Sequence, residues 1–483
     1  MKITKIEVSD FRGFPGRTPY SFDFGNARNL FIYGENGSGK SSLFRAIKEF
    51  FNRQTNPPAF ATFKNNLDPA ITTGHVTVHF DDGSVQSWTS SADRPLNALP
   101  ASQTSLQVGC LDYRSLLETN FSQRGDNVNL FDIAVTHLVP HLEVPTPPPL
   151  GSRTIGELWR SVVISKPMKH YQSNLRLCER ALKRFNDAFE PVITPLINKA
   201  TELLSEFPNT DLTLGASFHP VEYDTLGRRF KNLELILSVE RQGTQLLGHH
   251  NFLNEARLSS VGLVIYLAGL LVSVPGTSQY PKLLVLDDVL VGLDMANRLP
   301  VLTILEKFFA DWQIILLTYD QIWYEMVQVD MDASQWQAYE LWLGQDGMTP
   351  VYKPRGAGSD FFTVRAREHL ANNDDRAAGM YTRAGFETKV KKYCDKRSVP
   401  VPYSKEPRGL KIEDAWRAAK AKAISAAQSG NNPTLVQNLT ALFHAADLAK
   451  KVILNPLSHS TPQLITRQEI AAAIAAVENL LFE

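Results

Sequence analysis

This 483-residue chain is poor in cysteine, carries no net charge and contains no apolar run long enough to cross a membrane. Its three cysteines, Cys110, Cys178 and Cys394, are far apart and lack metal-site spacing, which favours a reducing compartment over a disulfide framework. Fifty basic residues balance fifty acidic ones, so any surface for nucleic acid or membrane must be local. The most apolar run, 261–274, falls short of the ~20 residues of a membrane helix, and the first residues lack the apolar segment of a signal peptide. We therefore expect a soluble, cytoplasmic protein of roughly two to four domains.

The chain contains one strong motif, a loop between an apolar strand at 30–33 and a helix that begins near residue 40. Its loop, GENGSGKS, fits the pattern G-x-x-x-x-G-K-[ST] in a strand–loop–helix context. Backbone N–H groups of such a loop point inward and, with the positive end of the helix, hold nucleotide phosphates. We expect Lys40 to reach the β- and γ-phosphates and Ser41 to hold Mg²⁺; a glycine-rich turn is the alternative. The expected nucleotide-binding residues of the loop are Gly34, Glu35, Asn36, Gly37, Ser38, Gly39, Lys40, Ser41 and Ser42.

A second acidic element follows much later, where residues 283–286 form a short apolar run that ends in Asp287 and Asp288. Four apolar residues predict a buried strand, and the carboxyl end of such a strand is where ligands bind in parallel sheets. We expect Asp287 to bind Mg²⁺, directly or through water, and Asp288 to polarise the attacking water as general base. The alternative is a strand-ending acidic turn, but a phosphate loop in the same chain favours the catalytic interpretation.

Other elements are predicted from periodicity. Leu175, Cys178, Leu182, Phe185 and Phe189 form one face of a helix, which Pro191 and Pro195 are expected to kink or end before a further helix runs to about residue 207. Period-two alternation with an Asp-Asp-Gly-Ser turn predicts a hairpin at 75–80 and 85–89. The remaining expected elements are strands at 3–9, 21–24, 217–223, 232–239 and 313–317, an apolar helix after 252, a helix at 301–309 and an edge strand at 336–344.

The distance in sequence between the phosphate loop and the acidic strand end indicates which class of ATPase this is. Lys40 and Asp287 are 247 residues apart (from 40 to 287). A head split by such an insertion resembles the ABC-type ATPases of chromosome maintenance and repair. Residues 253–257, LNEAR, stand where that class has its L-S-G-G-Q signature, and Gly292-Leu293-Asp294 resembles its D-loop. With LVLDDVLVGLD, the chain is similar to the RecF/OLD-like ABC ATPases, the AAA15 group, over residues 1–150 and 211–350.

That resemblance implies an α/β fold: an ABC-type phosphate-loop ATPase head with an inserted helical arm and a C-terminal all-helical domain. The expected segments are the N-terminal lobe of the head at 1–151, the arm at 152–210, the C-terminal lobe at 211–352, a linker at 353–361 and the helical domain at 362–483. The alternative for the arm is a lid helix packed on the core.

The resemblance also implies ATP and Mg²⁺ as cofactors and a homo-oligomer in which two heads sandwich ATP. Asn254 would then donate to the γ-phosphate held by the other copy, Arg257 would add positive charge, and Asp294 would act across the same contact. The alternative for Asn254 is a helix N-cap, because Asn is a good cap, and both roles can hold at once.

Three departures from the family pattern point to slow hydrolysis, with ATP acting more as a clamp than as a fuel. Asp288 replaces the usual Glu and is shorter by about 1.5 Å of reach. Tyr319 stands at the position of the switch histidine; it can bond a phosphate but does not change charge near neutral pH. Residues 112–114, DYR, stand where a Q-loop glutamine belongs.

A nuclease site in this chain is not expected. Asp330-Met331-Asp332 is the only D-x-D after the ATPase strands and is interpreted as a surface turn rather than part of a Toprim domain. His459 lacks the spaced arginine of a HEPN ribonuclease, so a histidine at the end of a packed helix is favoured. A local basic cluster, interpreted as a solvated helix surface or a site for phosphate or an acidic protein, comprises Lys391, Lys392, Lys396 and Arg397.

The whole set resembles the AriA family, the ATPase subunits of PARIS anti-phage defence systems. It implies a closed oligomer that holds a separate Toprim nuclease effector, AriB, inactive until a phage-encoded trigger such as a DNA mimic releases it to cleave host tRNA. Two alternatives stay open: the ATPase subunit of a Septu-like nuclease complex, which shares the head motifs, and a RecF-like DNA clamp. A clamp needs a basic stripe, and the mixed charges of residues 168–207 argue against it.

Overall fold

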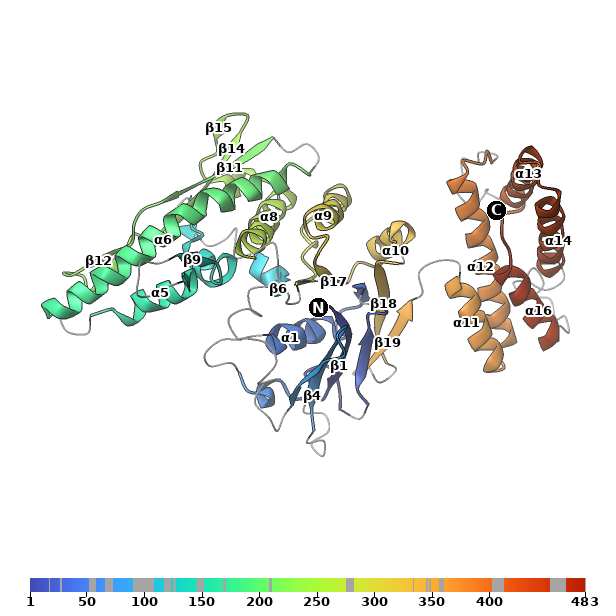
Figure 1. The fold of residues 1–483 in the computed structure, drawn as a ribbon, viewed down its shortest axis with the longest axis horizontal. Helices are drawn as coiled ribbons and strands as arrows, with labels where there is room; N and C mark the ends of the chain where they lie inside the picture. Colours follow the sequence, from blue (N-terminus) through green and yellow to red (C-terminus); the bar gives the residue numbers. More distant parts are fainter. Residues whose placement is uncertain are drawn as a thin grey trace. The chain divides into compact units, whose positions relative to one another are not determined.

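The computed structural model describes the chain except residues 17, 27, 52–57, 66–72, 90–107, 117–122, 125–126, 146–151, 168–170, 208–210, 275–281, 333, 345, 347–348, 356–359, 402–411, 452–465 and 483. The described residues form two compact units, Met1–Pro354 and Arg355–Glu483 (Figure 1).

A six-stranded sheet forms the centre of the first unit, in the order β19-β18-β3-β17-β16-β6. The pairs from β18 through β6 are parallel. Because parallel strands end at the same edge, the residues that follow β3, β16 and β17 come together there. The strands are β3 (Asn29–Gly34), β6 (Val108–Asp112), β16 (Leu283–Asp287), β17 (Gln313–Thr318), β18 (Trp336–Leu343) and β19 (Pro350–Arg355).

The predicted strand at 336–344 is present but is not at the edge of the sheet, because β19 lies outside it. The first residues of the predicted linker, Lys353 to Arg355, belong to β19. The physical reason is aromatic packing: the Tyr352 ring lies 5.7 Å from Tyr20 and 5.4 Å from Phe22, which holds this segment against the sheet. Pro354 is tolerated because an edge strand does not need every backbone donor.

A four-stranded antiparallel sheet and helix α1 cover one face of the central sheet. Its order is β2-β1-β4-β5, which confirms the predicted hairpin. Gln313 of β17 joins the two sheets: its side chain accepts from the Ile3 N–H at 2.7 Å and donates to the Ile3 carbonyl at 2.8 Å. The elements are β1 (Ile3–Ser9), β2 (Tyr20–Asp23), α1 (Lys40–Phe50), a 3₁₀ turn η1 (Phe60–Phe63), β4 (His75–Phe80) and β5 (Val85–Thr89).

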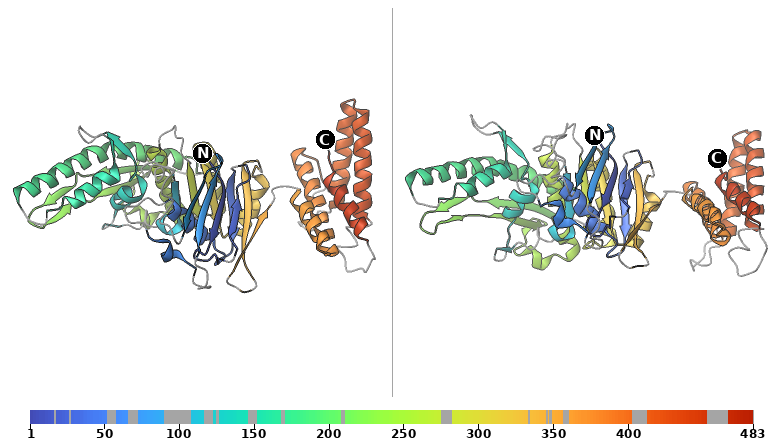
Figure 2. Two further views of the ribbon diagram at one scale, coloured as in Figure 1. Left: turned by 60° about the horizontal axis from the view of Figure 1, so that its bottom comes forward. Right: turned by 90° about the horizontal axis from the view of Figure 1, so that it is seen from below.

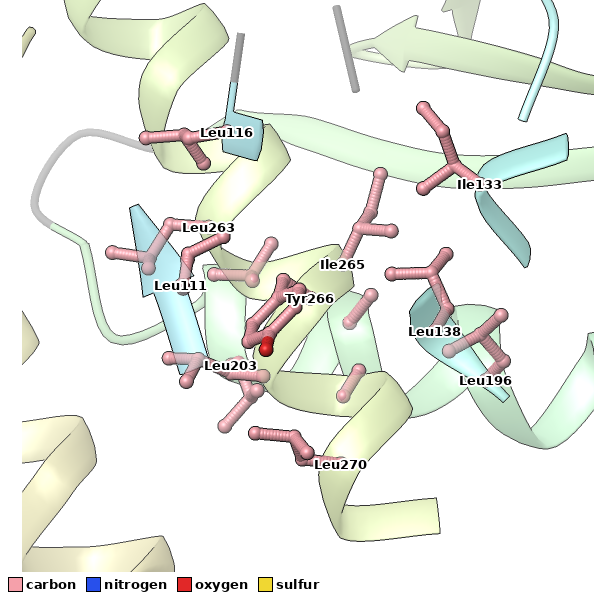
Figure 3. Packing of buried hydrophobic residues seen from close by; sticks show 14 of the residues in the cluster. Leu111, Leu116, Ile133, Leu138, Leu196, Leu203, Leu263, Ile265, Tyr266 and Leu270 are labelled. Carbon is pink, nitrogen blue, oxygen red and sulfur yellow. The ribbon is translucent and has the colours of Figure 1, made fainter. Parts of the chain in front are cut away.

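The other face carries α8 (Glu255–Ser273), α9 (Met295–Phe308) and α10 (Gln321–Asp330). α8 is apolar all round and is buried on every side, as expected of a core helix. Figure 3 shows Tyr266 of α8 among Leu111 of β6, Leu203 and Leu270. Among the described residues, α8 alone is long and apolar enough to cross a membrane, and 72% of its 18-residue apolar window is buried inside the protein.

An elongated part of the first unit is built from helices and strands together (Figure 2). Helices α5 (Ile155–Ile164) and α6 (Gln172–Leu204) fall within the predicted arm, and strand β11 packs on α6. Asn186 of α6 also bonds both backbone groups of Val221 at 3.0 Å. The strands are β11 (Leu212–Phe218), β12 (Glu222–Asp224), β13 (Arg229–Lys231), β14 (Leu235–Arg241) and β15 (Thr244–Gln245).

Pro191 and Pro195 are predicted to kink or end the helix before a further one begins. The predicted end is wrong, because α6 runs unbroken for 33 residues through both. Both prolines lie on the exposed face, whereas Val192, Ile193 and Leu196 are buried on the opposite one. The carbonyls that lose an N–H partner therefore face water, and burial of the apolar side holds the helix together.

Short elements complete the first unit. β9 (Glu143–Pro145) pairs with β10 (Ser152–Thr154), and β7 (Gln123–Arg124) pairs with β8 (Asn127–Val128). The others are α4 (Phe131–Ile133), the π-helical turn η3 (Ala134–Leu138) and α7 (His249–Phe252).

The second unit is all helical where the structure describes it, as predicted. Its core is centred on Trp416, whose ring meets Phe386, Phe443 and Phe482 and whose indole N–H donates to Asp447 at 2.6 Å. The predicted basic cluster lies exposed at the end of α12, and His459 lies outside the described residues. The helices are α11 (Asp360–Ala371), α12 (Asp375–Lys396), α13 (Ile412–Ser429), α14 (Pro433–Ala449) and α16 (Arg467–Glu478).

Candidate functional site

The loop between β3 and α1 has the backbone shape that a phosphate cradle requires. Gly37 and Gly39 have φ values of 87° and 103°, which side chains disfavour, and a Cβ at Gly39 would lie 3.1 Å from the Phe14 ring. Ser38 is fully buried and its hydroxyl has no hydrogen-bond partner. A buried unpaired polar atom in a loop of this shape indicates a place for a ligand.

Lys40 lies across this loop. Its ammonium donates to the Gly34 carbonyl at 2.6 Å and to the Glu35 carbonyl at 3.3 Å, and the residue is only 4% exposed. Burial lowers the pKa of Lys40, and the nearby carboxylates of Asp288, Asp287 and Glu35 oppose that shift. The ammonium is therefore positioned at the phosphate-binding loop and surrounded by negative charge.

Asp287 ends β16 at the same edge of the sheet. It is 5% exposed, and its Oδ1 atom has no hydrogen-bond partner. The nearby Ser41 side chain acts to lower the pKa of its carboxyl. Burial, together with the negative charge of Asp288, raises the pKa of Asp287 to about 6. A buried carboxylate with an open oxygen is suited to a cation.

Asp288 directly follows Asp287, and its backbone leaves the extended conformation of the strand. Its backbone is left-handed, with φ of 53°, a conformation that Asp adopts more readily than longer side chains do. Its Oδ1 accepts from the Tyr319 backbone N–H at 2.8 Å, and its Oδ2 lies 3.8 Å from Lys40 Nζ. Burial raises the pKa of Asp288, while Lys40 and the Tyr319 N–H act against that shift.

The side chains present fit Mg²⁺ bound together with a nucleotide. Ser41 and Asp287 offer oxygen ligands from adjacent elements, and Mg²⁺ commonly takes one or two protein oxygens, with phosphate and water completing its shell. In the part of the chain that the structure describes, no group of three or more His, Cys, Asp or Glu residues is placed to hold a metal by itself. The donor set suits a nucleotide-bound cation better than a metal held by protein alone.

A third carboxylate stands beside Asp287. Asp112 ends β6 directly opposite Asp287 in the parallel register, and its charge adds to the raised pKa of Asp287. Asp112 Oδ1 accepts from the Ser115 N–H at 2.8 Å. The segment 112–114, which occupies the Q-loop position in the sequence, is thus adjacent to the acidic strand.

Tyr319, at the switch-histidine position, is 41% exposed. Its backbone N–H, not its ring, makes the bond to Asp288. What the structure shows for this residue is an orienting backbone donor, a role that does not depend on the side chain.

Asn254 and Asp294 lie at helix starts and are exposed. Asn254 caps α8, its Oδ1 accepting from the Arg257 N–H at 3.0 Å, as the capping interpretation predicted. Asp294 caps α9 in the same way through the Asn297 N–H at 3.0 Å. The Arg257 guanidinium lies 3.4 Å from Asp211 Oδ1, so part of its charge is already balanced.

The structure therefore divides the predicted site residues into two groups. Lys40, Ser41, Asp287 and Asp288 come together at one edge of the sheet. The bonds of Asn254, Arg257 and Asp294 run within their own helices or to Asp211, and none of these contacts joins them to the phosphate loop.

Sequence-based prediction misses one candidate residue. Arg12 is exposed and left-handed, with φ of 48°, and its N–H donates to the Phe63 carbonyl at 2.6 Å. The next residue, Gly13, donates to Ser42 Oγ at 3.1 Å, which fixes this turn against the phosphate loop. A strained arginine held beside a phosphate site is a candidate anion ligand. The only signal in the sequence is the segment Phe11-Arg12-Gly13-Phe14, which predicts a turn and nothing about the phosphate loop.

A family model matches part of the chain. Residues 5–127 match a family model described as an AAA domain. The chain is similar in structure to the recombination mediator RecF with ATP, at 12% identity and a TM-score of 0.44, over 73% of this chain and 98% of that one. It is also similar to the Smc head domain with an extended coiled coil derived from Pyrococcus furiosus (12%, 0.42, 77% and 99%) and to the SMC head from Thermotoga maritima (15%, 0.34, 73% and 99%). No curated protein sequence matches the chain.

Proposed function

We propose that this chain is an ABC-type phosphate-loop ATPase that binds ATP with Mg²⁺ and hydrolyses it slowly, in keeping with the AAA-domain match over residues 5–127. The supporting observation is the convergence of Lys40, Ser41, Asp287 and Asp288 at one edge of the sheet. Lys40 holds the β- and γ-phosphates, Ser41 and Asp287 hold the cation, and Asp288 accepts the proton of the attacking water. The cation, when bound, neutralises charge on the phosphate oxygens.

The second part of the proposal is that two copies complete each site. Asn254 and Asp294 are exposed at the starts of separate helices, where helix N-termini favour an anion. One chain supplies the loop beneath the nucleotide, and a second copy supplies Asn254 and Asp294 to its open side. Slow hydrolysis in a single copy follows, because the γ-phosphate then lacks the amide donor of Asn254.

The third part concerns the role of the assembly. The head motifs resemble the AriA family, and the helical second unit has a hydrophobic core of its own. We propose a cytoplasmic oligomeric scaffold and sensor in anti-phage defence, which sequesters a separate Toprim nuclease effector until a phage protein, a DNA mimic among the candidates, triggers release. The chain itself is proposed to lack nuclease activity.

A direct experiment tests the first two parts. Purified protein is assayed for phosphate release from ATP with Mg²⁺, and its mass is followed by light scattering with and without ATP. We expect turnover well below one per second and an ATP-dependent rise in mass, both abolished in Lys40→Ala. A turnover of tens per second, or a mass that does not change with ATP, would overturn the proposal that ATP holds two copies together and is hydrolysed slowly. Affinity purification from cells expressing the neighbouring genes tests the third part, by whether a nuclease co-purifies.

One observation favours a second candidate, a clamp that binds nucleic acid. The hairpin β12–β13 places further cations beside α6, whose charges are mixed in sequence. The exposed basic residues of these elements and of the hairpin turn outnumber the exposed acidic ones by seven to five, and Lys199 and Asp224 are half-buried. The basic residues are Arg176, Arg180, Lys183, Arg184, Arg228, Arg229 and Lys231, and the acidic ones are Glu179, Asp187, Glu190, Glu202 and Glu222. Duplex binding that weakens steeply with salt and is lost in Arg228→Glu with Arg229→Glu would support this candidate.

A further inference from the structure

An ion pair joins the starts of α9 and α10 close to Asp288. Arg298, in the first turns of α9, has its Nη1 atom 2.5 Å from Asp320 Oδ2. Asp320 caps α10 by accepting the Trp323 N–H at 2.9 Å through its other oxygen. The Arg298 side chain is only 12% exposed, so water competes little for this pair.

Asp320, the acidic partner of this pair, is connected to Asp288 through Tyr319. Asp320 directly follows Tyr319, whose backbone N–H donates to Asp288 Oδ1 at 2.8 Å. The Asp320 N–H also donates to Thr318 Oγ1 at 3.1 Å, which fixes the short segment after β17. The position of Asp320 therefore sets where the donor to Asp288 lies.

Arg298, the basic partner, also contacts the loop before α9. Arg298 Nε donates to the Leu293 carbonyl at 2.8 Å, one residue before the cap Asp294. Gly292, at the start of that loop, packs so closely on α8 that a Cβ there would overlap the Ser259 hydroxyl. The loop 292–294 thus lies between the helix that Asn254 caps and the Arg298 guanidinium.

We propose that Arg298 is a positioning residue that couples the loop 292–294 to the orientation of Asp288. A guanidinium is planar and rigid, so its bonds to Leu293 and Asp320 share one fixed geometry. A shift of the loop on contact with a second copy moves Asp320, and with it the Tyr319 N–H that orients Asp288. Lysine carries the same charge but lacks this fork, so it cannot hold both partners at once.

This inference rests on the proposed ATPase function, and its test separates the two. In Arg298→Gln and Arg298→Lys we expect kcat to fall at least about tenfold, which corresponds to about 1.4 kcal/mol. The KM for ATP and the ATP-dependent rise in mass should stay within threefold of wild type, because neither residue is placed at the nucleotide. Asp320→Asn keeps an oxygen for the Trp323 N–H and should reproduce the loss from the other partner.

A double-mutant cycle and a matched control complete the design. Arg298→Gln with Asp320→Asn should be no slower than either single variant, because both remove the same bond. Lys307→Gln removes an ion pair of the same 2.5 Å length, more exposed to water, to Glu206 at the far end of α9 and should leave kcat unchanged. Wild-type kcat in Arg298→Gln, a drop in Lys307→Gln of equal size, or losses that multiply in the double variant would overturn the coupling alone. Absence of hydrolysis in the wild-type protein would overturn the proposed function, and the coupling with it.

Discussion

Lys40 Nζ lies 3.8 Å from Asp288 Oδ2 while it donates to the Gly34 and Glu35 carbonyls of its own loop. The ammonium is therefore held by backbone oxygens and faces a carboxylate. An incoming phosphate must replace those carbonyls as its partner, and it gains a charge-assisted bond in return. Lys40, Asp287 and Asp288 have different partners, so a separate prediction follows for each.

Lys40→Met should weaken ATP binding by about tenfold to a hundredfold, since hydrogen bonds to charged groups contribute about 1.5–3 kcal/mol. Titration with a fluorescent ATP analogue measures the change. Lys48→Met, on the same helix but over the Phe44 ring, is the control and should bind as wild type does. Unchanged affinity in Lys40→Met would remove this lysine from the site.

Asp288→Asn should slow hydrolysis by about 10²- to 10⁴-fold, the usual contribution of a general base. Asparagine keeps an oxygen for the Tyr319 N–H and tolerates the left-handed backbone, so the local structure should persist. ATP affinity should stay near the wild-type value, and the ATP-bound assembly should accumulate. Single-turnover phosphate release, measured beside equilibrium binding, separates the two effects; equal losses in both would contradict the assignment.

Asp287→Asn should abolish Mg²⁺-dependent hydrolysis and yet stabilise the nucleotide-free protein. The folded pKa of Asp287 is raised to about 6 from an ordinary value of 3.8, so burial of its charge destabilises the folded state above pH 6. Because a tenfold change in a proton's binding constant corresponds to about 1.4 kcal/mol, the gain should approach about 3 kcal/mol at pH 8. It should shrink as the pH falls from about 6 to 4, where wild-type Asp287 takes up a proton. Thermal unfolding at several pH values checks this, and a variant less stable than wild type at pH 8 would contradict it.

Asn254→Asp should separate the capping role from the role across the subunit contact. Aspartate caps a helix as well as asparagine, so the unfolding temperature should hardly change. A carboxylate facing the γ-phosphate of a second copy would repel it, so the ATP-dependent rise in mass should be lost. Asn254→Ala instead removes the cap and should cost about 1 kcal/mol of stability. Persistent ATP-dependent assembly in Asn254→Asp would exclude this loop from the contact.

Pro191→Ala and Pro195→Ala should each stabilise the protein, because alanine restores a backbone N–H in the interior of α6. The gain should be about 1–3 kcal/mol, the helix cost of proline less its effect on the unfolded chain. Pro433→Ala is the matched control: this proline lies in the first turn of α14, where its missing N–H costs nothing. Urea unfolding followed by circular dichroism compares the three variants; a loss of stability in the α6 variants would show that the prolines fit that helix better than alanine.

The cluster of Lys40, Ser41, Asp287 and Asp288 could be predicted from sequence because each residue lies inside a local pattern. Lys40 lies in a spaced loop motif, and Asp287 follows a fully apolar run, so strand order alone brings them together. The partners of Arg298 could not be predicted in this way. Its bonds to Leu293 and Asp320 depend on how the starts of α9 and α10 lie side by side. The periodicity of the sequence does not predict that arrangement.

The errors in the predicted fold have the same cause, since contacts between distant segments are not visible in local sequence patterns. A proline is judged by its effect on backbone bonding, but Pro191 and Pro195 face water along a helix whose other side is buried, and tertiary packing outweighs the local cost. Residues 353–355 look like linker because Pro354 precedes the Gly-Ala-Gly-Ser segment at 356–359. Tyr352, however, packs against aromatic rings of a strand more than three hundred residues earlier.

The position of β3 in its sheet has a consequence for how the protein is made. Both neighbours of β3, β17 and β18, come from the second half of the chain. Between Gly34 and Gln313 the ribosome must add 279 residues (from 34 to 313), which takes roughly 15 to 60 s at the usual elongation rates. Throughout that interval a strand of four consecutive apolar residues has no partner in the central sheet. The nascent chain therefore exposes an aggregation-prone edge early in translation and needs shielding until its second half emerges.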